Sequence, residues 1–180
     1  MKFSITDSPF GHFGLVFRDV AGVNKLQRLF LPDDRDSVLS RIHDEYPAAQ
    51  ESNHGMDNLV ELIVNYLEGK KVSIPMNFVN ESMCSRFQLR VLNAEREIPY
   101  GKTATYSWVA QRTGTSSARA VGSALAKNPF PIIVPCHRAI RADRTVGGFQ
   151  GGGQMKRAFL LMEGVRFDGT MRVVEEAIMR

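Results

Sequence analysis

One stretch constrains this chain more than any other, and it reads Ile132-Ile133-Val134-Pro135-Cys136-His137-Arg138. The β-branched apolar run at its start predicts a buried strand, which the proline ends because it cannot donate to a strand ladder. The fold must therefore place a thiol, an imidazole and a guanidinium at the end of a buried element. A thiol is a nucleophile only as thiolate, and a neighbouring base such as His137 is the usual means of activating it. Taken alone, Cys136 could be a buried structural cysteine, but its flanking residues favour a nucleophile.

The size and composition of the chain exclude several classes of protein. Its 180 residues suffice for one domain or two small ones with an apolar core. No stretch approaches the roughly 20 apolar residues of a membrane span, and the first residues lack the apolar centre of a secretory signal. Cys84 and Cys136 are the only cysteines, so disulfides do not define the fold. We expect no membrane partner and a reducing location, cytoplasmic or, in a prokaryote, nucleoid-associated.

Charge is distributed unevenly along the chain. Residues 1–82 contain 8 Lys or Arg and 12 Asp or Glu, a net charge of −4, whereas residues 83–180 contain 15 and 7, a net charge of +8; together they give the +4 of the whole chain. A basic half joined to an acidic half predicts that one part meets a polyanion and the other does not. We therefore predict an N-terminal domain over residues 1–82 and a C-terminal domain over residues 83–180.

The first domain is predicted to mix strands and helices. The expected elements are strands at residues 10–17 and 25–31, helices at 38–46 and 57–68, and a strand or connector at 70–75. Asp57 is expected to cap the start of the longer helix, and Gly69 stands where a C-terminal cap belongs. Nothing here gathers catalytic groups, so this domain is expected to be a scaffold.

The second domain is predicted to contain short helices joined by tight turns. They are expected from Arg86 to a turn at residues 98–101, from Tyr106 to Arg112, and from Ser116 to Lys127. Thr103 or Thr105 is expected to cap the second of these helices, and the last two form a helix-turn-helix pattern. The third helix opens with small residues, which allow close approach either to nucleic acid or to another helix of the protein.

Taken together, these residues resemble the O6-alkylguanine-DNA alkyltransferases, also called methylated-DNA–protein-cysteine methyltransferases. The motifs that carry the resemblance are Phe87-Gln88, Ile98-Pro99-Tyr100-Gly101, Thr105-Tyr106, Ala118-Arg119-Ala120-Val121-Gly122, Asn128-Pro129, Pro135-Cys136-His137-Arg138, Gly147-Gly148-Phe149-Gln150-Gly151-Gly152 and Glu163-Gly164. They cover residues 84–167 densely, and the first third of the chain fits only loosely. The resemblance implies an α+β fold, with an N-terminal ribonuclease-H-like α/β domain and a mainly helical C-terminal domain containing a winged-helix-like helix-turn-helix.

The implied activity is direct reversal of DNA damage. A stacked base cannot present an alkyl group on guanine O6 to a protein nucleophile, so the base is flipped into a pocket. Cys136 then attacks the alkyl carbon and keeps the group as a stable thioether. Each molecule acts once, without a cofactor, on O6-alkylguanine and on O4-alkylthymine.

The same resemblance implies a role for each of four further residues. His137 takes the thiol proton through a bridging water, and Glu163 orients the imidazole. Asn128 braces the active-site loop around the cysteine. Tyr106 crowds the phosphate of the flipped nucleotide and donates a proton or hydrogen bond toward the leaving guanine.

DNA binding is assigned by resemblance to the helix-turn-helix of a monomeric protein. Arg119 matches an arginine that fills the gap in the base stack, from a helix lying in the minor groove of double-stranded DNA. The other expected DNA contacts are Tyr106, Ser116, Ser117, Ala118, Ala120, Gly122 and Arg138. The expected lesion pocket consists of Phe149, Gly147, Gly148, Val134 and Pro131.

The sequence departs from the family pattern at several positions. Phe149 stands where many members carry a tyrosine, which predicts an altered preference among alkyl groups, and Gln150 beside it is also less usual. No cysteine precedes Cys84, and His12, His43 and His54 show no ligand spacing, so we expect no zinc site. Cys84 itself is expected to be a structural or surface thiol.

Three other functions use part of the pattern. Alkyltransferase-like damage-binding proteins keep the fold but lack the acceptor cysteine, and an intact Cys136 argues against them. A cysteine hydrolase with Cys136, His137 and Glu163 as its triad leaves the helix-turn-helix and Arg119 without a role. A transcription factor would leave Cys136 unexplained. Alkyl transfer from DNA is the function that accounts for every motif.

Overall fold

The computed structural model describes residues 1–52 and 54–180, and the chain divides into two compact units. The first unit comprises residues 1–83 and 129–133, and the second comprises residues 84–128 and 134–180. The first contains β1 (Lys2–Thr6), β2 (His12–Val20), β3 (Val23–Asp33), α1 (Arg35–Glu45), β4 (Gln50–Glu51), α2 (Asp57–Leu67) and the 3-10 helices η1 (Met76–Phe78) and η2 (Glu81–Met83). The second contains α3 (Arg86–Arg96), β5 (Ala104–Thr105), α4 (Tyr106–Arg112), α5 (Ala118–Ala126), η3 (Cys136–Arg138), β6 (Ala139–Ile140), α6 (Gly152–Met162) and η4 (Glu175–Ala177). Within the described residues, no helix is both long and apolar enough to cross a membrane.

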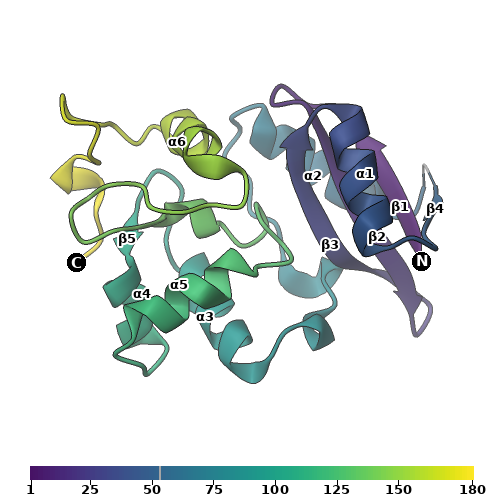
Figure 1. The fold of residues 1–180 in the computed structure, drawn as a ribbon, viewed down its shortest axis with the longest axis horizontal. Helices are drawn as coiled ribbons and strands as arrows, with labels where there is room; N and C mark the ends of the chain where they lie inside the picture. The colour runs from purple at the N-terminus through teal and green to yellow at the C-terminus, as the bar shows by residue number, and fades with distance from the viewer. Residues whose placement is uncertain (53) are drawn as a thin grey trace. The chain divides into compact units, whose positions relative to one another are not determined.

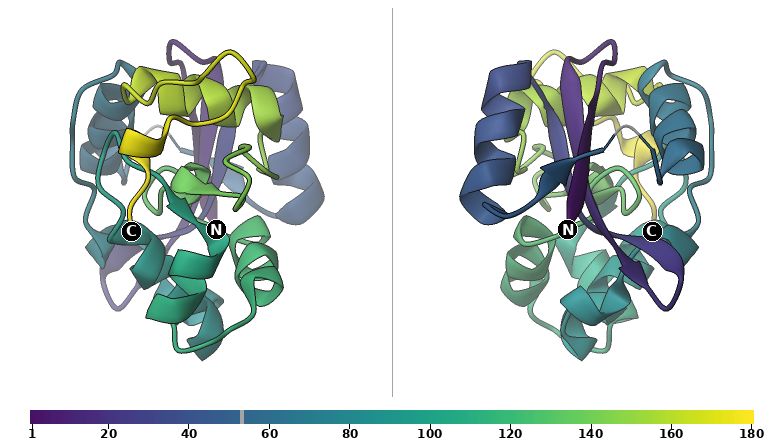
Figure 2. Two further views of the ribbon diagram at one scale, coloured as in Figure 1. Left: turned by 90° about the vertical axis from the view of Figure 1, so that its left-hand side faces the viewer. Right: turned by 90° about the vertical axis from the view of Figure 1, so that its right-hand side faces the viewer.

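A mixed sheet forms the centre of the first unit (Figure 1). β1 and β3 both pair antiparallel with β2, and β4 pairs parallel with β1, which gives the order β3-β2-β1-β4. Ala21 and Gly22 join β2 to β3 with positive φ angles of 55° and 83°, as expected for a turn whose twist suits a hairpin. α1 covers one face of this sheet (Figure 2), and its buried Val38 and Ile42 share a core cluster with Phe3 and other sheet residues.

The predicted elements of the first unit are present with corrections. Both predicted strands form, but β1 was missed because five residues carry little periodic signal. The helix at residues 57–68 exists as α2, and Gly69 follows it with a φ of 84°. Its N-cap is Met56 and not Asp57, whose carboxylate instead accepts a hydrogen bond from the Gly55 N–H at 3.1 Å. Residues 70–75 are a connector.

The helix-turn-helix of the second unit is built from α4 and α5, as predicted. Thr105 caps α4 by accepting a hydrogen bond from the Trp108 N–H at 3.1 Å, and Ser117 caps α5 in the same way at the Ala120 N–H, also at 3.1 Å. Gly114 takes up the turn between them with a φ of 73°. α3 packs against both helices, so α5 is held on a small helical core.

The apolar run before Pro135 is not a strand. Its residues are buried as predicted, but they form a tight turn in which Ile132 has a φ of 73°. Residues 129–133 belong to the first unit, where the Pro129 carbonyl accepts a hydrogen bond from the Leu29 N–H at 2.9 Å. A short apolar run signals burial, but its periodicity cannot separate a strand from a buried turn.

Candidate active site

Cys136 is the first residue of η3, and Asn128 holds its side chain. The Asn128 Nδ2 donates to the Cys136 Sγ at 3.3 Å and to the Val134 carbonyl at 3.1 Å, and the asparagine is completely buried. One amide therefore fixes both the sulfur and the backbone that leads to it. Burial raises the pKa of the Cys136 thiol to about 11, although the hydrogen bond from Asn128 opposes that rise. The resting cysteine is consequently a neutral thiol that needs a base in order to react.

His137 and Glu163 form a buried pair next to this thiol. The His137 Nε2 lies 2.9 Å from the Glu163 Oε1, and both side chains are fully enclosed. Burial alone would raise the pKa of Glu163, but hydrogen bonds from His137 and Arg138 and the positive charge of the Arg138 guanidinium hold it at about 2. Burial lowers the pKa of His137, although the hydrogen bond and the negative charge of Glu163 act to raise it. The imidazole is therefore neutral at pH 7. Since the carboxylate can only accept, Nε2 carries the proton and Nδ1 is the basic nitrogen.

Arg138 does not fit the expectation that it contacts DNA. Its Nε and Nη2 donate to the Glu163 carboxylate at 2.9 and 2.8 Å, and its Nη1 donates to the Ile98 carbonyl at 2.7 Å. The side chain is almost fully buried. Its guanidinium is thus used inside the protein, where it neutralises Glu163 and fixes the position of the carboxylate.

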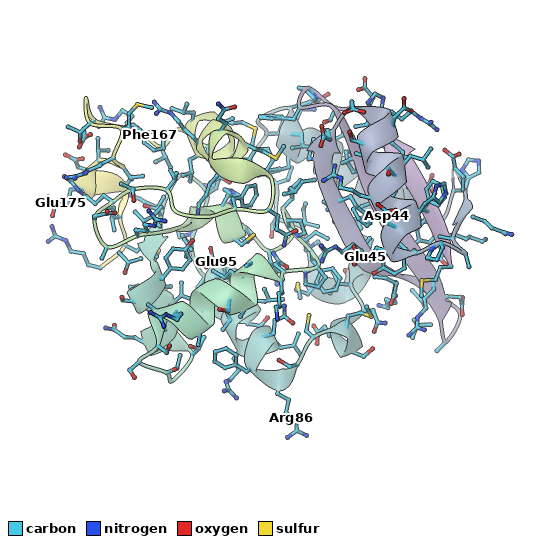
Figure 3. The ribbon with its side chains drawn as sticks, viewed as in Figure 1. Asp44, Glu45, Arg86, Glu95, Phe167 and Glu175 are labelled. Carbon is cyan, nitrogen blue, oxygen red and sulfur yellow. The ribbon has the colours of Figure 1, made fainter. Side chains whose placement is uncertain are left out.

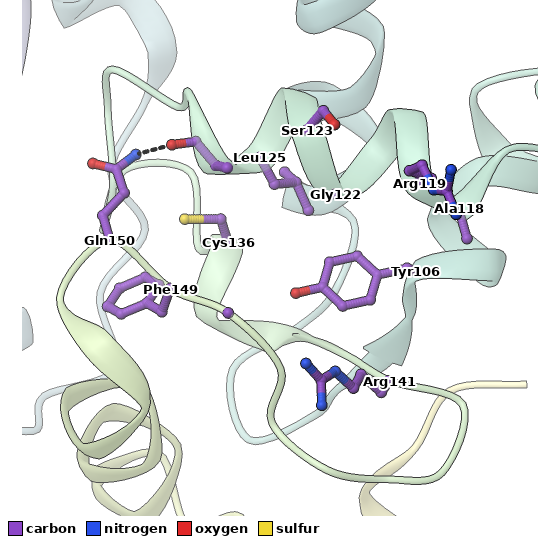
Figure 4. Close-up of a pocket in the computed structure, with 12 residues that line it drawn as sticks. Tyr106, Ala118, Arg119, Gly122, Ser123, Leu125, Cys136, Arg141, Phe149 and Gln150 are labelled. Carbon is purple, nitrogen blue, oxygen red and sulfur yellow. Dashed lines mark hydrogen bonds between the residues drawn. The ribbon is translucent and has the colours of Figure 1, made fainter.

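A pocket of about 850 Å³ has Cys136 in its lining (Figure 4). It is lined by Tyr106, Ala118, Arg119, Gly122, Ser123, Leu125, Ala126, Cys136, Arg141, Gly148, Phe149 and Gln150. The Phe149 ring packs edge-on against His137 and Phe159, with centroid separations of 6.3 and 6.0 Å. Phe149 therefore gives an apolar wall to the space next to the sulfur.

Of the thirteen residues expected to contact DNA or to form the lesion pocket, six line this pocket, and six besides Arg138 do not. Ser116 precedes α5, Ser117 is its N-cap and Ala120 is in its first turn, and none of the three lines the pocket. Gly147 and Val134 are close to the site without lining it, and Pro131 belongs to the first unit. The backbone of Gly147 lies against the Tyr106 side chain. Gly147 has a φ of 70°, and a Cβ at this position would lie 3.2 Å from the Tyr106 hydroxyl.

Sequence reasoning did not assign three polar residues of this site. Arg141 is an exposed cation on the pocket wall. Gln150 Nε2 donates to the Ala126 and Asn128 carbonyls at 3.1 and 2.8 Å, which ties the glycine-rich loop to the end of α5. Lys156 is completely buried, three and four residues before the buried Phe159 and Leu160. A cation at the apolar spacing of a helix is a signal that could have identified Lys156.

Fold and pocket together define a helix-turn-helix protein in which α5, the second helix of the motif, lines a cysteine-containing pocket. Residues 86–165 match the family model for the DNA binding domain of 6-O-methylguanine DNA methyltransferase. The chain is 44% identical over 111 residues to a methylated-DNA–protein-cysteine methyltransferase of Methanothermobacter thermautotrophicus, a match that spans 62% of each protein. It is 39% identical over 120 residues to the Sulfolobus acidocaldarius protein of the same name, covering 67% of this chain and 75% of that protein.

Solved structures agree with these sequence matches. The crystal structure of Mycobacterium tuberculosis O6-methylguanine methyltransferase superposes with a TM-score of 0.70 at 32% identity, covering 90% of this chain and 92% of that one. The structure of M. tuberculosis OGT in complex with DNA gives a TM-score of 0.73, also at 32% identity. The chain belongs to the methylated-DNA–protein-cysteine methyltransferase family, which confirms the resemblance found in its sequence.

Proposed function

We propose that this protein repairs DNA by moving the alkyl group of O6-alkylguanine irreversibly onto Cys136. The observation that carries the proposal is the position of Cys136, in a pocket also lined by α5 and beside a neutral His137 held by an ionised Glu163. The names of the relatives support the same reaction, and one solved relative is bound to DNA.

The reaction forms one bond and breaks one bond. The Cys136 sulfur attacks the alkyl carbon, a carbon–sulfur bond forms, and the carbon–O6 bond breaks with its electron pair left on guanine. The thiol proton passes to the His137 Nδ1 through a bridging water, and Glu163 stabilises the imidazolium that results. Tyr106 gives a proton to the departing guanine. Burial, together with the charges of Glu95 and Cys136, raises the pKa of Tyr106 to about 12, so its hydroxyl is protonated and able to donate at pH 7.

DNA would be engaged through α5, in the minor groove of a duplex. Arg119 is exposed at the pocket edge, and the small Ala118 and Gly122 beside it would let the helix approach the sugar–phosphate backbone closely. The protein would act as a monomer. We further infer that the first unit is ribonuclease-H-like and that the β5–β6 pair serves as a small wing beside the helix-turn-helix.

The pocket would set the range of lesions. Phe149 supplies a ring without a hydroxyl, so the wall near the sulfur offers packing but no phenolic hydrogen bond. We expect O6-methylguanine to be accepted, with O4-alkylthymine as a second substrate. Relative transfer rates from oligonucleotides that carry each lesion would measure this preference.

Mass spectrometry after mixing the protein with duplex DNA containing O6-methylguanine tests the proposal. One added methyl group on the peptide that contains Cys136 is the expected result. Tight binding to the lesion without any change in mass would overturn transfer in favour of damage sensing. Hydrolysis of esters without DNA would instead indicate a cysteine hydrolase.

Arg119→Ala should slow repair of duplex DNA at least tenfold, because the gap left by the flipped base is no longer filled. Free O6-benzylguanine has no base stack, so its reaction with Cys136 should change little. Single-turnover rates on the two substrates measure the difference. An equal loss on both would show that Arg119 shapes the pocket and does not act on the duplex. Arg112→Ala, which removes an exposed arginine of α4 outside the pocket, is the matched control.

A further inference from the structure

Arg141 is a cation on the pocket wall to which the repair reaction described above assigns no role. It directly follows β6, and its side chain is exposed. No carboxylate of the described residues forms an ion pair with its guanidinium. A guanidinium keeps its charge at every physiological pH, so this one is available to an anion from outside the protein.

The pairing of β5 with β6 places Arg141 beside Tyr106. The two strands are parallel, and their pairing ends with Thr105 opposite Ile140, so Tyr106 and Arg141 leave the two strands side by side. Gly147 lies against both side chains: a Cβ built there would be 3.2 Å from the Tyr106 hydroxyl and 3.4 Å from the Arg141 Cγ. The positive charge of Arg141 also opposes the rise that burial causes in the pKa of Tyr106. Backbone pairing therefore fixes where this guanidinium enters the pocket.

The wall of the pocket is positively charged. Its described residues include two arginines, Arg119 and Arg141, and no Asp or Glu. Arg119 comes from α5 and Arg141 from the turn after β6, and Tyr106 lies between them in Figure 4. Charges of one sign that line a cleft attract a ligand of the opposite sign, and a nucleic acid strand is such a ligand.

Three carboxylates of the same unit are held elsewhere. Glu95 is enclosed in the helical core on α3 (Figure 3), and the side chain of Glu163 is fully enclosed as well. Asp143, two residues after Arg141, accepts hydrogen bonds from the Thr145 N–H at 3.0 Å and the Thr145 hydroxyl at 2.7 Å. None of them neutralises Arg141 by direct contact, so its guanidinium can bind an anion without first breaking an ion pair.

We propose that Arg141 binds a backbone phosphate of the damaged strand next to the flipped nucleotide, so that the strand is held at the β6 wall of the pocket as well as at α5. This inference rests on the proposed function. A base that turns into the pocket leaves its phosphates at the mouth, where an exposed side chain can reach them. The planar guanidinium can donate two parallel hydrogen bonds to one phosphate, and the contact releases a counterion from the DNA.

The salt dependence of binding tests the proposal in the Cys136→Ala protein, which leaves the lesion intact. Arg141→Gln removes the charge but keeps most of the stem beside Gly147. Its binding to an O6-methylguanine duplex should be about tenfold weaker at about 50 mM salt and about threefold weaker at about 200 mM, because loss of one phosphate contact lowers the slope of log K against log salt by about 0.9. Arg141→Lys should keep the native slope. Fluorescence anisotropy of labelled DNA measures all of these values.

Arg144→Gln is the matched control for these measurements. It removes an arginine of the same turn, which pairs with Asp168 at 3.8 Å and does not line the pocket. Binding and its salt slope should therefore stay native.

Single-turnover transfer by the protein with Cys136 intact tests the same contact without relying on affinity alone. Arg141→Gln should react more slowly with duplex below saturation and at a nearly native rate at saturation. Free O6-benzylguanine has no phosphate, so its rate should stay within about twofold of native. Methylphosphonate carries no charge, and placing it at each phosphate next to the lesion in turn should locate the contact. At one position it should weaken the native protein as Arg141→Gln does, and weaken the variant no further.

An unchanged salt slope in Arg141→Gln would overturn the inference. An equal loss of rate on free O6-benzylguanine would also overturn it, since it would show that Arg141 shapes the pocket around Tyr106. Failure of the native protein to methylate Cys136 would instead overturn the proposed function. The two failures are therefore distinguishable.

Discussion

Replacing Cys136 by alanine is expected to reduce alkyl transfer from one group per protein molecule to none. The sulfur is the acceptor, and no other cysteine lines the described pocket. The substitution removes one atom from a side chain that Asn128 already holds in place, and it leaves Arg119 and the rest of α5 untouched. Binding to duplex DNA that contains O6-methylguanine should therefore stay within about twofold of the native protein. Transfer of labelled methyl to protein, together with fluorescence anisotropy of labelled DNA, would measure both properties.

Cys84 provides the matched control for that experiment. It is the other cysteine of the chain, and it lies before α3, outside the pocket. Cys84→Ala should transfer one methyl group per molecule at the native rate. Labelled protein recovered from Cys136→Ala, but absent from the double variant, would identify Cys84 as an acceptor and contradict the assignment of Cys136.

Removing the carboxylate of Glu163 should cause the largest loss of stability of any single change at this site. Glu163→Ala leaves the Arg138 guanidinium buried without its partner, and breaking a buried ion pair in this way costs about 3 to 5 kcal/mol. His137 loses the carboxylate that fixes its ring and keeps the proton on Nε2, so transfer should also slow at least a hundredfold. Urea unfolding and single-turnover transfer would measure the two losses separately.

The pH dependence of stability offers a second measure of the same ion pair. The pKa of Glu163 is held at about 2 in the folded protein, below its ordinary 4.5, so the stabilising effect is present above pH 4.5. It is lost as the pH falls toward 2, and the native protein should lose about 3 kcal/mol of unfolding free energy over that range. Glu163→Gln keeps the shape but cannot ionise, so its stability should vary less across this range.

An exposed ion pair in the same unit serves as the reference. Glu97 and Arg112 are 2.8 Å apart and about half exposed, so Glu97→Ala should cost less than about 1 kcal/mol. A cost for Glu163→Ala no larger than that for Glu97→Ala would show that Arg138 finds another partner or reaches water. The ion pair would then not be what holds His137 in place.

Sequence alone determined the features that depend on neighbours along the chain. Thr105 and Ser117 start α4 and α5 because a hydroxyl can reach an N–H three residues later whatever the rest of the fold does. The adjacency of Cys136 and His137 is likewise evident from the sequence. The family motifs identified Glu163, which lies 26 residues after His137. The order of α3, α4 and α5 followed from the same local signals, whereas α6 was not predicted.

Tertiary structure decided the features that depend on which buried groups meet. Arg138 follows His137 in sequence, yet its guanidinium pairs with Glu163 and the Ile98 carbonyl, 25 and 40 residues away. Ile132 is as apolar as a strand residue, but packing places it in a turn. Glu95 and Lys156 come from helices far apart in the chain, and both are completely buried in the folded protein. The energy of a buried charge depends on its partners in space, and only the folded chain determines which partners it has.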